Sequence, residues 1–258
     1  APKKGVPRWF TLWSLSFVKE MRSERLGLFW WFAEPLLLIM VFTFMALVFF
    51  GGNVAGMPAF PFAIIGVANF LTFRITLMTT AAGTGHLTSA LHDPSVTRFD
   101  ILVGQAPRPL VANACVAGAL LMYLMADGQI PAPERPAIIV MCLVCSATMG
   151  FSVGLMLSFA SFIYPGIRRL YIIVLRLVAV SSGLFYVSEQ LPQQYKALVL
   201  WNPILHASQL SRDAWFQIYA TQDASFAYVW VCLLCALFMG LSLAIVERRR
   251  RAEKGDIE

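Results

Sequence analysis

The residues of this chain that could do chemistry are few, and several are charges embedded in apolar sequence. Arg74 and Arg176 each lie inside a long apolar stretch, and Glu34 precedes Pro35 near the start of another. A charge deep in a membrane span costs about 2.5–3.5 kcal/mol on insertion scales, so these side chains should face protein or water. The two arginines could offset the charge of an acidic substrate, or each could form an internal pair or snorkel to the membrane surface. Glu34 is equally compatible with a capping role, because a helix N-terminus favours a carboxylate.

A second group of polar residues interrupts the apolar sequence between Ser181 and Trp215. Backbone that leaves helical geometry near a bilayer must be buried in protein or line a wet cavity. We therefore expect residues 188–215 to form a re-entrant pair of short helices on the outer side of the membrane. Arg212 and Asp213 are adjacent, and we expect them to pair with each other and hold this shape. The segment predicts an outer gate formed by Asn202, His206, Ser211, Arg212 and Asp213.

Signatures of catalysis are missing from the sequence. The nucleotide-binding pattern G-x-x-x-x-G-K-[ST] does not occur, and neither a Ser-His-Asp set nor a metal-binding helix motif is present. His86, His92 and His206 are isolated polar residues rather than a ligand set. The cysteines, including two C-x-x-C pairs, lie in apolar stretches, where a thiol is best explained as a small buried hydrophobe. We therefore expect no enzyme activity, metal or cofactor in this chain.

The composition indicates that lipid surrounds most of these residues. Of 258 residues, 59% are hydrophobic and 13% are charged, whereas a soluble domain carries roughly 25% charged residues. A membrane span needs roughly 20 apolar residues. The chain therefore predicts a single all-α integral membrane domain with six spans, and no A-x-A site for a cleavable signal peptide follows the first one. The expected spans are approximately 29–50, 60–82, 110–126, 137–164, 170–187 and 226–246.

Two stretches outside the spans have patterns of their own. After a basic lead, residues 9–25 repeat apolar residues at helical spacing, which is typical of a helix lying in the membrane interface; the alternative is packing on a soluble partner. In the segment 84–109, Asp93-Pro94 predicts the start of a short helix. Two apolar residues on a polar-flanked turn can dock into a groove of another protein. We expect such a contact through Leu87, Leu91, Asp93, Arg98 and Asp100.

Small residues recur every four positions in two of the expected spans. Such ridges allow helices to approach closely inside a membrane, so we expect both to be helix-packing faces. The members are Ser146, Gly150, Gly154 and Ser158 in one span, and Cys232, Ala236, Gly240 and Ala244 in the other.

The distribution of lysine and arginine predicts the orientation of the spans. Fifteen of the twenty such residues lie in the first 25 residues, the 84–109 and 165–169 segments, and the tail 247–258. Cytoplasmic loops carry an excess of these residues. Both termini and the 84–109 segment should therefore face the cytoplasm, while the 188–215 segment should face the opposite side.

Three stretches resemble motifs of a known family. Arg25-Leu-Gly-x-x-Trp30-x-x-x-Glu34-Pro35 resembles the entry motif of polysaccharide-exporting ABC permeases. The late segments Ser182-Gly183-x-Phe185, Pro192-x-x-Tyr195, Trp201-Asn202-Pro203-x-x-His206 and Ser211-Arg212-Asp213-Ala214 are similar to the signature of capsular polysaccharide exporters. Leu91-x-x-Pro94-x-Val96-x-Arg98-x-Asp100 falls at the cytoplasmic coupling region of the family, although His92-Asp93-Pro94 stands where the family has an asparagine-rich turn.

The resemblance implies the fold of a type-2 ABC exporter permease in the bacterial inner membrane. It implies a homodimer docked on a separate cytoplasmic ABC ATPase that binds ATP and magnesium, with a periplasmic co-polymerase or adaptor and an outer-membrane export protein continuing the path. The expected cargo is a lipid-linked, acidic capsular polysaccharide, and the outer gate would then be periplasmic. Under this hypothesis the substrate path contains Arg22, Arg25, Trp30, Phe42, Phe44, Arg74, Tyr171, Arg176, Tyr186 and Trp201.

Other functions stay open at this point. Within the same class, the cargo could be another lipid-linked glycan, such as O-antigen or teichoic acid, or a lipid or drug. An ion-coupled secondary transporter would need acidic residues or broken helices near the midplane, and Glu34 is the only candidate, at an edge. A non-transporting membrane scaffold for a polysaccharide assembly complex would not need the arginines inside the spans.

Overall fold

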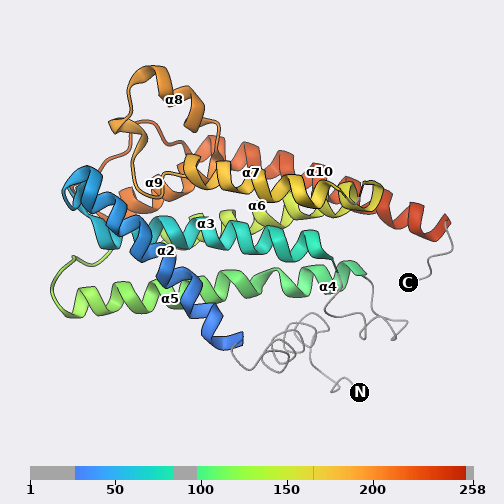
Figure 1. Cartoon of the computed structure of the whole chain (residues 1–258), viewed down its shortest axis with the longest axis horizontal. Helices are drawn as coiled ribbons and strands as arrows, with labels where there is room; N and C mark the ends of the chain where they lie inside the picture. The colour runs from blue at the N-terminus through green and yellow to red at the C-terminus, as the bar shows by residue number, and fades with distance from the viewer. Residues whose placement is uncertain (1–26, 84–97, 165, 254–258) are drawn as a thin grey trace.

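The computed structural model describes residues 27–83, 98–164 and 166–253, and within these ranges the chain is mostly helical (Figure 1). The predicted interfacial helix at residues 9–25 lies outside the described residues, as does the start of the predicted coupling segment. No placement can therefore be compared for Arg22, Arg25, Leu87, Leu91 and Asp93.

The described elements follow one another as long helices joined by short connections. A two-residue antiparallel hairpin joins the first two helices, and its turn residues Ala55 and Gly56 have φ angles of 51° and 84°, the backbone that a tight hairpin requires. The elements are α2 (Gly27–Phe50), β1 (Asn53–Val54), β2 (Met57–Pro58), α3 (Ala59–Ala82), α4 (Arg98–Gln105), α5 (Pro107–Ala126), α6 (Pro136–Ile163), α7 (Ile167–Ser181), a 3₁₀ turn (Ser188–Gln190), α8 (Gln193–Leu200), α9 (Pro203–Trp215) and α10 (Phe226–Glu253).

Five stretches of the described chain are long and apolar enough to cross a membrane, which agrees with an integral membrane protein. These correspond to five of the six predicted spans, with α4 and α5 counted together. The remaining prediction, residues 170–187, was too long at its end, because α7 ends at Ser181 after 15 residues. At a rise of 1.5 Å per residue, such a helix is about 22 Å long, shorter than the hydrocarbon core of roughly 30 Å.

The early end of α7 has a local cause at Gly183. This residue has a φ of +63°, a left-handed conformation that glycine adopts without steric cost. The chain from Gly183 to Val187 is not helical, and all of these residues except the half-buried Phe185 are buried. The apolar run of the sequence therefore continues beyond the helix that it was expected to form.

The centre of the bundle is α3. In the most apolar window of α3, 83% of the residues are buried, compared with 17% for α2 and α10. It packs against α6 above all, and also against α2, α5 and α9. Its buried polar residues, Asn69, Thr72, Thr76 and Thr80, fit this central position, because polar side chains within a membrane span face protein rather than lipid.

The small-residue ridges are packing faces, as predicted. A Cβ atom on Gly154 of α6 would lie 2.6 Å from the Cβ of Thr80 in α3, and one on Gly240 of α10 would lie 2.6 Å from the carbonyl oxygen of Ser152 in α6. Both distances are shorter than carbon atoms tolerate, so only glycine permits these helices to approach this closely. The ridges thus set the α3–α6 and α6–α10 contacts.

The described elements place the predicted cytoplasmic segments at one end of the bundle and the predicted outer segments at the other (Figure 1). The arginine-rich end of α10 lies with α4 and the start of α7 at the first end. The hairpin, the α5–α6 connection, α8 and α9 lie at the second. We refer to these as the basic end and the α9 end.

Candidate functional site

Arg212, on α9, is one of the most completely buried side chains in the described chain, with no exposed surface. Its guanidinium lies 3.5 Å over the ring of Phe62. Nη1 donates to the carbonyl oxygen of Gly183 at 2.9 Å, and Nε and Nη2 donate to that of Phe62 at 3.3 and 3.2 Å. Gly66 leaves the space for this group, since a Cβ there would overlap Nη2 of Arg212. Arg212 therefore joins the start of α3 to the turn after α7.

The predicted pairing of Arg212 with Asp213 is wrong. Asp213 instead pairs with Arg135 of the α5–α6 connection, at 3.1 Å, and Arg135 also donates to the carbonyl oxygen of Asp213 at 2.9 Å. The physical reason is helical geometry, because neighbouring residues on a helix do not face each other. The two charges hold α9 to different elements.

Asn202 begins α9 and connects it to the end of α7. Its Oδ1 accepts from the backbone N–H of Ile204 at 3.0 Å, an N-cap, with Pro203 at the first helical position. Its Nδ2 donates to the hydroxyls of Ser181 and Ser182, each at 3.0 Å. One side chain thus positions the start of α9 on the residues where α7 ends.

The other two predicted gate residues also lie in buried polar contacts. Nε2 of His206 is 2.8 Å from the carbonyl oxygen of Leu200, and Nδ1 accepts from the backbone N–H of Ser225 at 3.1 Å. This network fixes the neutral ring with its proton on Nε2, and burial lowers the pKa of His206. Ser211 accepts from Nδ2 of Asn69 at 3.2 Å, and Oδ1 of Asn69 accepts from Ser146. Asn69 was not among the residues predicted from the sequence, where its signal is a lone amide in an apolar span.

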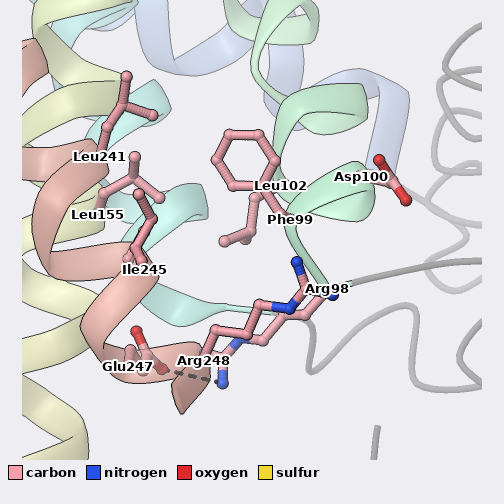
Figure 2. Close-up of a pocket in the computed structure, with 10 residues that line it drawn as sticks. Arg98, Phe99, Asp100, Leu102, Leu155, Leu241, Ile245, Glu247 and Arg248 are labelled. Atoms are coloured by element: carbon pink, nitrogen blue, oxygen red, sulfur yellow. Dashed lines mark ion pairs between the residues drawn. The ribbon is translucent and has the colours of Figure 1, made fainter.

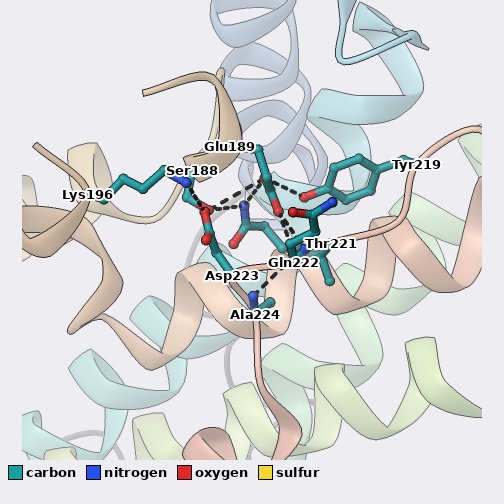
Figure 3. A network of polar contacts seen from close by, with 9 residues as sticks. Ser188, Glu189, Lys196, Tyr219, Thr221, Gln222, Asp223 and Ala224 are labelled. Atoms are coloured by element: carbon teal, nitrogen blue, oxygen red, sulfur yellow. Dashed lines mark hydrogen bonds and ion pairs between the residues drawn. The ribbon is translucent and has the colours of Figure 1, made fainter. Parts of the chain in front are cut away.

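A second network at the α9 end was also missed. Glu189 accepts hydrogen bonds from Tyr219 at 3.0 Å, Thr221 at 2.8 Å and the backbone N–H of Gln222 at 3.1 Å (Figure 3). Gln209 of α9 donates to Glu189 at 3.0 Å. The carboxylate therefore holds together the 3₁₀ turn, α9 and the connection to α10.

Asp223 extends this network to α8. Its Oδ2 accepts from Ser188 at 2.9 Å and pairs with Lys196 at 2.8 Å (Figure 3). Burial alone would raise the pKa of Asp223, but the hydrogen bonds from Lys196 and Ser188 and the charge of Lys196 lower it below its ordinary value. The connected side chains form one polar cluster, which consists of Ser188, Glu189, Lys196, Gln209, Tyr219, Thr221 and Asp223.

The described residues of the predicted substrate path lie in several different environments. Arg74 forms an ion pair with Glu34, which joins α3 to α2 and is the internal pair that the sequence left open. Arg176 is exposed on α7. The aromatic members divide between exposed and buried positions, and Trp30 lies in α2 with its side chain outside the described set. Phe44 and Trp201 are exposed, Tyr171 and Tyr186 are buried, and Phe42 stacks on Phe185 with ring centroids 6.1 Å apart.

The described coupling residues lie beside a cavity of about 500 Å³ at the basic end. Arg98 and Asp100 are on α4, and Figure 2 shows α4 facing α6 and α10 across the cavity. Arg98 pairs with Glu247 of α10 at 3.1 Å and donates to Ser158 of α6 at 3.2 Å. The α10 residues of this site were not predicted from the sequence. Its lining consists of Arg98, Phe99, Asp100, Leu102, Leu155, Leu241, Ala244, Ile245, Glu247 and Arg248.

Comparison with known proteins adds a family context to these sites. No family model matches the chain. It is 24% identical over 221 residues to the capsule polysaccharide export inner-membrane protein CtrC of Neisseria meningitidis serogroup A, covering 85% of this chain and 83% of that protein. It is 23% identical over 219 residues to BexB of Haemophilus influenzae, a protein of the same description, covering 84% and 82%. Over 91 residues, 35% of each chain, it is 31% identical to the polysialic acid transport protein KpsM of Escherichia coli.

These similarities extend over most of the chain and agree with the motifs at its beginning and near its end. The resemblance expected from the sequence is thereby confirmed: the chain is a relative of the capsule polysaccharide export inner-membrane proteins.

Proposed function

We propose that this chain is the membrane-spanning permease of an ATP-driven exporter that moves lipid-anchored, acidic capsular polysaccharide across the bacterial inner membrane. The observation that carries the proposal is the similarity to CtrC over 85% of the chain, combined with five apolar helices long enough to span a membrane. Two copies of the chain would enclose the glycan, and a separate cytoplasmic ATPase would hydrolyse ATP. A periplasmic adaptor and an outer-membrane protein would continue the path.

The rigid α9 end supports a role for residues 188–215 as the periplasmic boundary of this path. Buried contacts of Arg212 and Asn202 join α9 to α3 and to the end of α7, and Glu189 joins Gln209 of α9 to the connection before α10. A wall held in this way can resist the lateral pressure of a moving polymer. Trp201 within this segment and Phe44 on α2 are exposed aromatic residues whose flat faces would let sugar rings slide.

An acidic cargo is supported by Arg176, which is exposed and is the one charged residue between Leu170 and Ser181 of α7. We expect Arg176→Ala to reduce capsule export, and Arg169→Ala, which removes an exposed arginine at the start of the same helix, to leave it unchanged. Because Arg74 pairs with Glu34, the effect of Arg74→Ala on capsule export is compared with that of Glu34→Gln, which breaks the same ion pair. Wild-type export by both Arg176→Ala and Arg74→Ala would contradict a role for these charges in the path.

The contact with the ATPase is proposed at the segment 84–109, of which Arg98 and Asp100 are described. We expect Leu91→Asp to leave the protein folded in membranes but to abolish copurification of the ATPase. The matched control is Leu198→Asp, at an exposed leucine of α8 at the other end of the bundle. Copurification retained by Leu91→Asp would place the contact elsewhere.

The function as a whole is tested by reconstitution. The chain and the ATPase that copurifies with it are placed in lipid vesicles, and ATP hydrolysis is measured with acidic or neutral lipid-linked glycan. Stimulation by the acidic glycan is expected. Stimulation by a lipid or drug alone would favour a different exporter, and absence of a copurifying ATPase would favour the scaffold.

A further inference from the structure

The cavity at the basic end has two chemically distinct parts. Leu102 and Phe99 of α4 form one wall, and Leu155, Leu241 and Ile245 of α6 and α10 form the opposite wall (Figure 2). The charged groups of Arg98, Glu247 and Arg248 lie together at one end of this apolar slot (Figure 2). Its volume of about 500 Å³ falls within the range of ligand sites, roughly 300–1,000 Å³. The arrangement is that of a site for an amphiphile.

The charge at this end of the slot favours an anion. Arg98 is engaged by Glu247 at 3.1 Å, which neutralises the carboxylate within the lining. Arg248 is exposed, and none of the ion pairs found among the described residues uses it. Asp100 is directed away from the apolar walls (Figure 2). The next residues of α10 are also arginines, through Arg251, and arginine clusters that directly follow a membrane span attract anionic lipid.

We propose that this cavity binds one anionic phospholipid of the surrounding membrane. Its acyl chain would lie between Leu102 and Leu241, and its phosphate would lie at Arg248 beside the Arg98–Glu247 pair. The lipid would fill the slot between α4 and α10 and so connect the coupling region to the last helix of the bundle. This site requires no exported glycan and does not rest on the proposed function.

The test is retention of lipid by the full-length protein purified from cells that make no capsular glycan. The protein is equilibrated in bilayer discs of phosphatidylglycerol or of phosphatidylcholine and extracted into mild detergent. The number of lipids retained per chain is then measured by native mass spectrometry. One phosphatidylglycerol per chain is expected to be retained, with phosphatidylcholine lost. Equal retention of the two lipids, or retention of neither, would overturn the proposal.

Two substitutions locate the lipid within the cavity. Arg248→Gln is expected to weaken retention about fivefold, the effect of roughly one juxtamembrane cation, whereas Arg249→Gln, its matched control outside the lining, should change it less than twofold. Ala244→Phe would fill the apolar slot and abolish retention, while Leu234→Phe, on an exposed part of the same helix, would not. Thermal unfolding of each variant with and without phosphatidylglycerol provides a second readout. If phosphatidylglycerol raised the melting temperature of Ala244→Phe as much as that of the wild type, the lipid would bind elsewhere and the site would be refuted.

Discussion

The two ends of the helix bundle are held together by different kinds of contact. At the α9 end, the fully buried Arg212 bridges two backbone carbonyl groups, and the half-buried Glu189 accepts hydrogen bonds from several elements. At the basic end, Arg98 and Glu247 join α4 to α10 beside a cavity. Buried polar groups are costly to leave unpaired, so the α9 end should behave as one rigid unit. The described contacts of the basic end leave a cavity between α4 and α10, so we expect this end to move more readily.

The largest effect is expected from breaking the rigid end at Arg212. Arg212→Met keeps an apolar chain beside Phe62 but removes the hydrogen bonds to the Phe62 and Gly183 carbonyl oxygens. Loss of these charged donors should lower the free energy of unfolding by about 2–4 kcal/mol, measured by denaturant unfolding of the purified protein in detergent. Arg212→Lys should recover only part of the lost stability, because the ammonium group of lysine does not reproduce the planar, forked set of donors of a guanidinium. Wild-type stability in Arg212→Met would remove the basis for calling this end rigid.

The next largest effect on stability is expected at the contact between α3 and α6. Gly154→Ala should destabilise the protein by about 1–3 kcal/mol through overpacking, because its Cβ would meet Thr80 and the Leu77 carbonyl oxygen. The matched control is Gly118→Ala on α5, where a Cβ would meet no atom within 4 Å. There the better helix propensity of alanine should leave stability equal or raised. Similar changes at both positions would show that the ridge does not set the α3–α6 distance.

A smaller loss of stability is expected at the basic end. Arg98→Gln and Glu247→Gln each break the ion pair between α4 and α10, and each should cost about 1 kcal/mol, because a glutamine can still form a neutral hydrogen bond with the remaining partner. In a double-mutant cycle the combined loss should be smaller than the sum of the two single losses, since both variants remove this ion pair, although Arg98→Gln also removes the hydrogen bond to Ser158. If the basic end is the moving one, these variants should change ATPase stimulation more than they change unfolding. A loss of stability as large as that of Arg212→Met would erase the contrast between the ends.

The smallest effect is a pH dependence within the α9 end. The folded-state pKa of Asp223 is lowered below its ordinary value of 3.8 by Lys196 and Ser188, against the opposing effect of burial. The unfolded chain therefore takes up a proton first, so the stabilisation is complete well above pH 3.8 and is lost as pH falls through the folded pKa. The protection factors for hydrogen exchange of residues 216–225, which correct for the intrinsic pH dependence of the exchange chemistry, should fall below about pH 4 in the wild type. In Asp223→Asn, exchange should be faster at neutral pH and this acid-dependent component should be absent.

Much of the fold follows from local sequence. Long apolar runs predicted the helices α2, α3, α5, α6 and α10. The four-residue spacing of Gly150 and Gly154 predicted the packing face of α6. The length of α7 did not follow, because Gly183 takes a left-handed conformation within a run that remains apolar. Hydropathy measures the preference of residues for lipid and is insensitive to one backbone angle.

The polar sites were less predictable. Adjacent charges suggested that Arg212 pairs with Asp213, whereas Arg212 binds the carbonyl oxygen of Phe62, 150 positions earlier, and Asp213 binds Arg135. The Glu189 network joins residues about 30 positions apart, with no repeat or motif to indicate it. Such partners are chosen by which elements pack together.

The sequence by itself determined that this chain belongs in a membrane, where its helices run and to which family its motifs are similar, because transfer to lipid and helical periodicity are properties of local segments. Only the tertiary structure decided which buried charges are partnered, where α7 ends and that a cavity separates α4 from α10. Those outcomes depend on which helices pack together, although they are far apart in the sequence. Small residues such as Gly154 and Gly240 set the spacing between two helices, but only once those helices are in contact.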